Sequence, residues 1–263
     1  MTINSVNGDL MVSEILLILY LIFAVFVGVK LYGKTNSWLS ELDRITPPIV
    51  ETGKALKYGF LAFGGAAVLE LLVLYPISSD AGLLFLPLVA GFVEEGAKLS
   101  PYLRGGDELY RWRLTVKVAL IFAVIEAVLY GITLFFSGNI LGALLRIVVV
   151  MYHVSFTAIA LEDALKGSLL SGYLKAALLH TLYDAPPVFV TLAISDLSPP
   201  LASIMGIAAI VYTYYHVDEA FGVAHRMARR ALEERKKKAQ EFWNERGGIS
   251  FSEDDGMEFT SSP

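Results

Sequence analysis

Long apolar stretches, separated by short polar ones, occupy most of the chain. Seven of them approach or exceed the ~20 helical residues needed to cross a hydrocarbon layer of about 30 Å. They span residues 14–32, 58–77, 81–103, 114–136, 140–164, 173–194 and 201–221. None alternates apolar and polar positions as a barrel strand does, and only helices and closed barrels satisfy their backbone groups in lipid. The pattern therefore predicts an all-α fold, a polytopic membrane bundle of about seven transmembrane helices.

The positive charges fall on alternate connections between these segments. Lys and Arg follow the first, third, fifth and seventh segments, whereas the connections 78–80, 137–139 and 195–200 contain neither. Because cytoplasmic loops are enriched in Lys and Arg, we expect the N-terminus outside and the C-terminus in the cytoplasm. This places the protein in the cell membrane as a multi-pass integral protein.

Composition agrees with this class and narrows the chemistry. The chain is 55% hydrophobic and carries a net charge of −5. It has no cysteine, which excludes disulfides, thiolate metal ligands and a cysteine nucleophile. Residues 1–225 are expected to form the bundle, 226–246 a charged cytoplasmic helix near lipid headgroups, and 247–263 a disordered acidic tail. Nothing in the sequence indicates a nucleic-acid partner.

A cluster of charges interrupts the third apolar segment. Glu94, Glu95 and Lys98 lie within the stretch GFVEEGAKL. One charge at the centre of a membrane helix costs roughly 2.5–3.5 kcal/mol on insertion scales, so ionisable residues there are candidates for function. Helical spacing brings Lys98 within reach of Glu94 at i+4 and of Glu95 at i+3. The alternative is an ordinary salt bridge at the cytoplasmic end of the helix.

Further ionisable residues lie in the next three segments. Glu126 has no basic residue within a turn, so it either stays protonated or finds a partner on another helix. His153 follows Arg146 by two turns. For both residues the alternative interpretation is a role in helix packing and hydrogen bonding instead of catalysis. His180 and Asp184 share a helix face at i+4, where the carboxyl can fix the imidazole tautomer.

Four segments thus deliver polar groups to one zone of the membrane. At 1.5 Å per residue, Glu94 and His180 lie roughly 10 Å from the cytoplasmic ends of their segments, and Glu126 and His153 lie nearer the midplane. Glu70, in the second segment, is also intramembrane and has no assigned role. The spacing predicts a buried acid/base site and leaves its substrate open.

The order of these motifs resembles the PrsW-type membrane proteases, a branch of the superfamily of CAAX prenyl endopeptidases and bacteriocin-immunity-type proteases. The resemblance covers residues 58–189, within a peptidase core of 58–194. Its motifs are EExxK, FxxxE, a histidine on the next helix and HxxxD. In this chain they are Glu94, Glu95 and Lys98, then Phe122 and Glu126, then His153, and finally His180 with Asp184.

The resemblance implies an intramembrane endopeptidase that hydrolyses a peptide bond of a membrane-bound or membrane-proximal polypeptide. It implies catalytic roles for Glu94 or Glu95 as general base, together with Glu126 and His180. It implies supporting roles for Lys98, Phe122, His153 and Asp184. Glu126 stands where the related CAAX enzymes have histidine, and Asp184 where they have asparagine, so an oxyanion role falls mainly to His180.

Metal dependence and two other functions remain as alternatives. Glutamate chemistry without a cofactor is favoured because HExxH is absent, but Zn²⁺ held by His153, His180, Asp184 and Glu126 is the alternative. A catalytically inactive, immunity-type binding protein would keep the same residues. A proton- or cation-coupled transporter would also place carboxylates and histidines in the membrane, but transporters commonly contain internal repeats, and none is evident here.

Overall fold

Seven α-helices and two short 3₁₀ turns make up the part of the chain that the structure, a computed structural model, describes: residues 3–46, 52–77, 84–192 and 198–245. The helices are α1 (Ile3–Ile45), α2 (Thr52–Leu74), α4 (Leu86–Leu99), α5 (Glu108–Phe136), α6 (Ile140–Leu165), α7 (Leu169–Leu192) and α8 (Ser198–Glu245). The turns are η1 (Tyr75–Ile77) and η2 (Ser100–Leu103). The predicted all-α class is confirmed.

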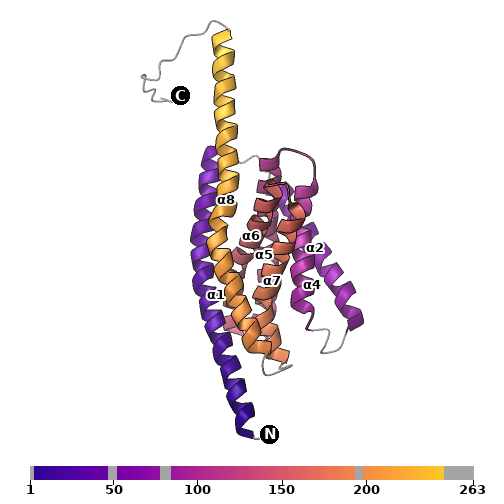
Figure 1. The fold of residues 1–263 in the computed structure, drawn as a ribbon. Helices are drawn as coiled ribbons and strands as arrows, with labels where there is room; N and C mark the ends of the chain where they lie inside the picture. Colours follow the sequence, from indigo (N-terminus) through magenta and orange to yellow (C-terminus); the bar gives the residue numbers. More distant parts are fainter. Residues whose placement is uncertain (1–2, 47–51, 78–83, 193–197, 246–263) are drawn as a thin grey trace.

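The two longest helices, α1 and α8, run side by side in the same direction along one side of the bundle (Figure 1). Asp218 of α8 joins them, since it accepts hydrogen bonds from Lys34 at 2.6 Å and from the Trp38 indole at 3.0 Å. The expected segments 201–221 and 226–246 form one continuous helix, α8, which projects beyond the other helices at its C-terminal end (Figure 1). The predicted acidic tail, 247–263, lies outside the described residues.

In the part of the chain that the structure describes, five helices are long and apolar enough to cross a membrane. They are Glu14–Ile45, Thr52–Leu74, Glu108–Phe136, Ile140–Leu165 and Pro199–Asn244. Their outward side chains are large and apolar, and Leu71, Phe136 and Ile147 are 68%, 82% and 69% exposed. Contiguous exposed apolar surface marks contact with lipid or with another protein. Together these features indicate a multi-pass membrane protein.

The third apolar segment differs from its expected form. Residues 81–103 were predicted as one spanning helix, but α4 begins at Leu86 and ends at Leu99, about 21 Å of helix. Pro101 has no backbone N–H to continue the α-helical hydrogen bonds, and the chain continues as the 3₁₀ turn η2. Helix α7 has 24 residues but is not among the five candidate spans. These two helices carry much of the polar cluster and pack against each other.

Two glycines allow α7 to approach its neighbours closely. A Cβ built on Gly172 would lie 2.1 Å from the Ala160 carbonyl oxygen of α6. A Cβ on Gly91 of α4 would lie 2.4 Å from the Thr181 hydroxyl and 2.6 Å from the Ala177 oxygen. Small residues permit such backbone contacts between membrane helices. They hold α4, α6 and α7 in register around the polar cluster.

Helix α7 continues through Pro186 and Pro187 instead of ending there. Because Pro187 has no N–H, it cannot donate to the Tyr183 carbonyl one turn earlier. That carbonyl accepts a hydrogen bond from the Tyr20 hydroxyl of α1. The backbone acceptor freed by the proline therefore ties α7 to α1.

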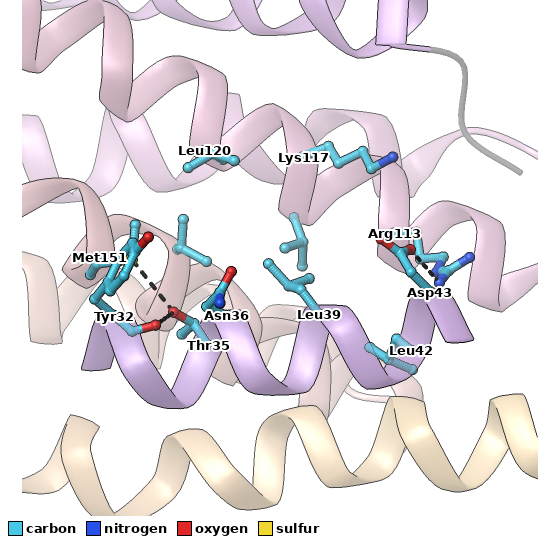
Figure 2. Close-up of a pocket in the computed structure, with 12 residues that line it drawn as sticks. Tyr32, Thr35, Asn36, Leu39, Leu42, Asp43, Arg113, Lys117, Leu120 and Met151 are labelled. Carbon is cyan, nitrogen blue, oxygen red and sulfur yellow. Dashed lines mark hydrogen bonds and ion pairs between the residues drawn. The ribbon is translucent and has the colours of Figure 1, made fainter. Parts of the chain in front are cut away.

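A cavity of about 220 Å³ lies between α1, α5 and α6, as Figure 2 shows. An ion pair between Arg113 and Asp43, 2.8 Å apart, lies toward one end, and a contact of 3.4 Å from the Thr35 hydroxyl to the Met151 sulfur lies toward the other. The remaining walls are mainly aliphatic. None of the predicted site residues lines this cavity, so it is separate from the polar cluster.

Candidate active site

Four helices bring buried ionisable side chains together inside the bundle. Helix α4 contributes three, and α5, α6 and α7 contribute one each. They are Glu94, Glu95, Lys98, Glu126, His153 and His180, and each is at most 8% exposed. The prediction that these segments converge on one zone is confirmed by their contacts.

Lys98 is the cation at the centre of the cluster. Its ammonium donates to Glu95 Oε1 at 2.7 Å and to His153 Nδ1 at 2.7 Å, and lies 3.5 Å from Glu94 Oε2. It also sits over the Phe122 ring, 4.8 Å from the centroid, in a cation–π contact. Lys98 thus reaches both glutamates, as the helical spacing predicted, but its short contact is with Glu95.

The lysine determines the tautomer of His153. An ammonium group can only donate, so the Nδ1 atom that it contacts carries no proton. The ring proton then lies on Nε2, which is 2.9 Å from Glu126 Oε2. His153 is therefore a neutral link between the Lys98 ammonium and the Glu126 carboxylate.

Glu126 has a second partner in Arg146. The guanidinium donates to Glu126 Oε1 and lies over the Tyr130 ring at 4.5 Å. Of the two possibilities left open by the sequence, the structure gives Glu126 partners on another helix. Arg146 and His153 lie seven residues apart on α6, which places both on the face toward α5.

His180 lies between two carboxylates. Its Nδ1 is 3.0 Å from Glu95 Oε1, and its Nε2 is 3.1 Å from Asp184 Oδ2 and 3.8 Å from Glu94 Oε2. Since Glu95 already accepts from Lys98, His180 Nδ1 is the donor in the first contact. The Glu95 carboxylate therefore orients the imidazole through Nδ1, as carboxylates commonly do. The other ring nitrogen, Nε2, then faces Glu94.

Two buried carboxylate oxygens of the cluster, Glu126 Oε2 and Glu94 Oε2, accept no hydrogen bond from any described residue. Glu126 Oε2 nevertheless lies 2.9 Å from His153 Nε2, and Arg146 binds the other oxygen of Glu126. Glu94 Oε2 has no contact that short. Three nitrogens surround this oxygen at longer range: Lys98 Nζ at 3.5 Å, and His153 Nδ1 and His180 Nε2 at 3.8 Å each. A buried acceptor without a donor is costly in a membrane interior, and Glu94 Oε2 is the one of the two without a close nitrogen, so it is the candidate to accept a hydrogen bond from a further group.

The sequence identified most of this site and missed part of it. Thr157, which donates to Glu95 Oε2 at 3.3 Å, gave no signal because a threonine in an apolar helix is common. Arg146 was left between packing and function, although its spacing of seven from His153 was a usable sign. Glu70 lines a cavity with Glu94 and Glu126, which the sequence could not show because the contact joins separate helices.

A metal site has a partial basis here. Glu94, His153 and His180 each offer a ligand atom, and these atoms lie within 4.8 Å of one another. The set predicted for Zn²⁺ included Glu126 and Asp184 instead of Glu94. However, the nitrogens of His153 already face Lys98 and Glu126 at 2.7 and 2.9 Å. A metal would have to displace the lysine, so the donors do not fit a metal in this arrangement.

Comparison of the chain with protein-family models, with curated proteins and with solved structures finds no match. The geometry of the cluster therefore carries the argument about function.

Proposed function

We propose that this protein is an intramembrane endopeptidase that hydrolyses a peptide bond of a membrane-bound or membrane-proximal polypeptide. The observation that carries the proposal is the Glu94 carboxylate, buried and without a hydrogen-bond donor, beside His180 Nε2. The neighbouring Glu95 is engaged by Lys98, His180 and Thr157. This division assigns the general base to Glu94 and a positioning role to Glu95.

In the proposed reaction, a water molecule bound to Glu94 Oε2 attacks the carbonyl carbon of the scissile bond. Glu94 accepts one proton from the water as the new C–O bond forms. The carbonyl oxygen becomes an oxyanion, which His180 stabilises through Nε2–H while Asp184 balances the charge of the imidazolium. Collapse of the intermediate breaks the C–N bond, and Glu94 returns its proton to the leaving amine.

The remaining charges hold this arrangement in place. His153 links Lys98 to Glu126, and Arg146 binds the other oxygen of Glu126. Such a network keeps Lys98 directed at Glu95 and away from a full ion pair with Glu94. Glu94 is then only partly neutralised by Lys98, which suits a carboxylate that must take a proton from water.

The proposal includes seven membrane crossings with the N-terminus outside and the C-terminus in the cytoplasm. The alternation of Lys- and Arg-bearing connections supports this orientation. Helices α4 and α7, which are not among the five candidate spans, lie side by side between α2 and α8 and would complete the bundle. Their polar side chains would then face the bundle interior, where such groups are tolerated.

The test is cleavage of a library of transmembrane and juxtamembrane peptides by the purified protein. Glu94→Gln should lower the rate by roughly 10²–10⁴-fold without unfolding the protein, because the substitution is isosteric and removes only the base. Glu162→Gln is the matched control, since Glu162 is also buried but pairs with Lys166 at the far end of α6.

Two results would contradict the proposal. Full turnover by folded Glu94→Gln protein would exclude Glu94 as the base. Absence of cleavage by the wild type, together with uptake into proteoliposomes driven by a pH gradient, would favour a proton-coupled transporter.

A further inference from the structure

A second cavity, of about 180 Å³, opens directly onto the polar cluster. It lies between α2, α4 and α5, at the edge of the bundle where α2 is seen in Figure 1. Three of its lining residues are carboxylic acids, Glu70, Glu94 and Glu126. The others are Phe63, Ala66, Ala67, Phe122, Leu129, Tyr130 and Thr133.

The cavity presents acceptors that lack donors. Glu94 is more than nine-tenths buried, and its Oε2 atom accepts no hydrogen bond from the described residues. Glu70 is half-buried, and its Oε1 atom likewise accepts none from them. Glu70 forms no ion pair with any cation in the described part of the chain. On this wall the Thr133 hydroxyl donates to the Leu129 carbonyl oxygen of its own helix.

The shape and the spread of the carboxylates identify the kind of ligand. Among the described residues, the one group whose ligand atoms come close enough for a metal combines Glu94 with the two histidines and excludes Glu70. The three acids thus form no metal-binding group among themselves. Glu126 is already engaged by Arg146 and His153, so Glu70 and Glu94 are the carboxylates that can contact the N–H groups of an ammonium or guanidinium. The volume is below the roughly 300–1,000 Å³ typical of pockets for drug-sized ligands, and it suits one side chain.

The apolar walls match the stem of such a side chain. Phe63 and Phe122 meet edge to face, with ring centroids 5.5 Å apart, and Ala66 and Ala67 leave room beside them. Lys and Arg carry a charged head on an apolar stem, and this cavity offers both carboxylates and apolar walls. In a membrane such a head needs a carboxylate partner.

We propose that this cavity receives a lysine or arginine side chain of the substrate, and that Glu70 recognises its positive charge. The proposal rests on the peptidase function above and gives it a specificity: cleavage near a basic residue that lies within or beside a transmembrane segment. Glu70 is then a specificity-determining residue that takes no part in bond cleavage.

The test compares peptides that differ only in Lys, Arg or norleucine at each position around the cut. Wild-type protein should favour Lys and Arg at one position. Glu70→Gln should lower kcat/KM for the basic peptide by roughly 30-fold or more, and Glu70→Asp should restore part of it. Neither variant should change kcat/KM for the norleucine peptide, and Glu162→Gln should leave the preference intact.

Failure of this proposal is distinguishable from failure of the peptidase function. Cleavage without a basic preference, or equal losses on both peptides in Glu70→Gln, overturns the recognition site and leaves the peptidase standing. If the wild type cleaves no peptide, the peptidase function fails, and the cavity is tested by thermal unfolding with n-butylguanidinium and n-butanol. A Tm increase with the cation that is absent in Glu70→Gln supports the cavity; equal shifts in both proteins overturn it.

Discussion

Replacing Lys98 by methionine should destabilise the protein strongly. Lys98 has no exposed surface, and its ammonium lies 2.7 Å from a Glu95 carboxylate that is equally buried. Methionine keeps most of the volume and removes the charge. The substitution therefore leaves a buried carboxylate without its cation, which is the costly way to break a buried ion pair.

The magnitude follows from the partners that remain. Loss of one member of a buried pair costs about 3–5 kcal/mol. Glu95 would retain His180 at 3.0 Å and Thr157 at 3.3 Å, so we expect the lower end, about 3 kcal/mol. For a chain of this size that corresponds to a fall of roughly 6–12 °C in Tm.

The assay is thermal unfolding of the purified variants in one detergent, extended to a double-mutant cycle. Lys98→Met combined with Glu95→Gln removes both charges, so its loss should be smaller than the sum of the two single losses by at least about 1 kcal/mol. Lys117→Met is the matched control. Lys117 lines the separate cavity in Figure 2 without an ion pair there, and its replacement should stay within about 0.5 kcal/mol of wild type.

The reasoning is refuted if Lys98→Met unfolds at the wild-type temperature. It is also refuted if the double variant loses as much as the two single variants together. Either result would mean that Lys98 does not neutralise Glu95 in the folded protein, and the assignment of Glu94 as the unengaged carboxylate would lose its basis.

Two further predictions concern packing and metal dependence. Gly172→Ala should lower the stability by roughly 1–3 kcal/mol, because its Cβ would meet a backbone carbonyl at 2.1 Å. Gly64→Ala is the control, since a Cβ there has open space and should stabilise α2 slightly. Thermal unfolding of both variants in one detergent is the measurement, and equal stability would contradict the close approach of α7 to α6. Treatment with 1,10-phenanthroline followed by dialysis should leave peptide cleavage unchanged, since Lys98 engages His153; loss of cleavage that Zn²⁺ restores would show that a metal takes part.

Much of the candidate site could be predicted because ionisable residues are rare in apolar membrane segments and are therefore easy to recognise in the sequence. Glu126 and His180 stand out in apolar helices, where each ionisable group carries a cost that calls for a reason. Local spacing also gave correct pairs: Lys98 with Glu95 at i+3, and His180 with Asp184 at i+4. Both depend only on helix geometry, which a sequence determines directly.

Pairs between helices could not be predicted in the same way. The contact of Lys98 with His153 joins residues 55 positions apart, and that of His180 with Glu95 joins residues 85 positions apart. Such contacts depend on helix rotation and on the approach distance, which Gly91 and Gly172 help to set. The extent of α4 was also wrong at the sequence level, because apolar character continues past the residues at which proline ends the helix.

The sequence by itself determined the all-α class, the apolar segments and the identity of the buried acids, bases and cations, because lipid imposes helices and makes every charge an exception. Only the tertiary structure decided which charges pair. Lys98 pairs mainly with Glu95, and Arg146 pairs with Glu126. Glu94 Oε2 accepts no hydrogen bond from the described residues, and Glu70 lines the same cavity as Glu94. The physical reason is that a charge in a low-dielectric interior is governed by partners a few ångströms away, and helix packing chooses those partners.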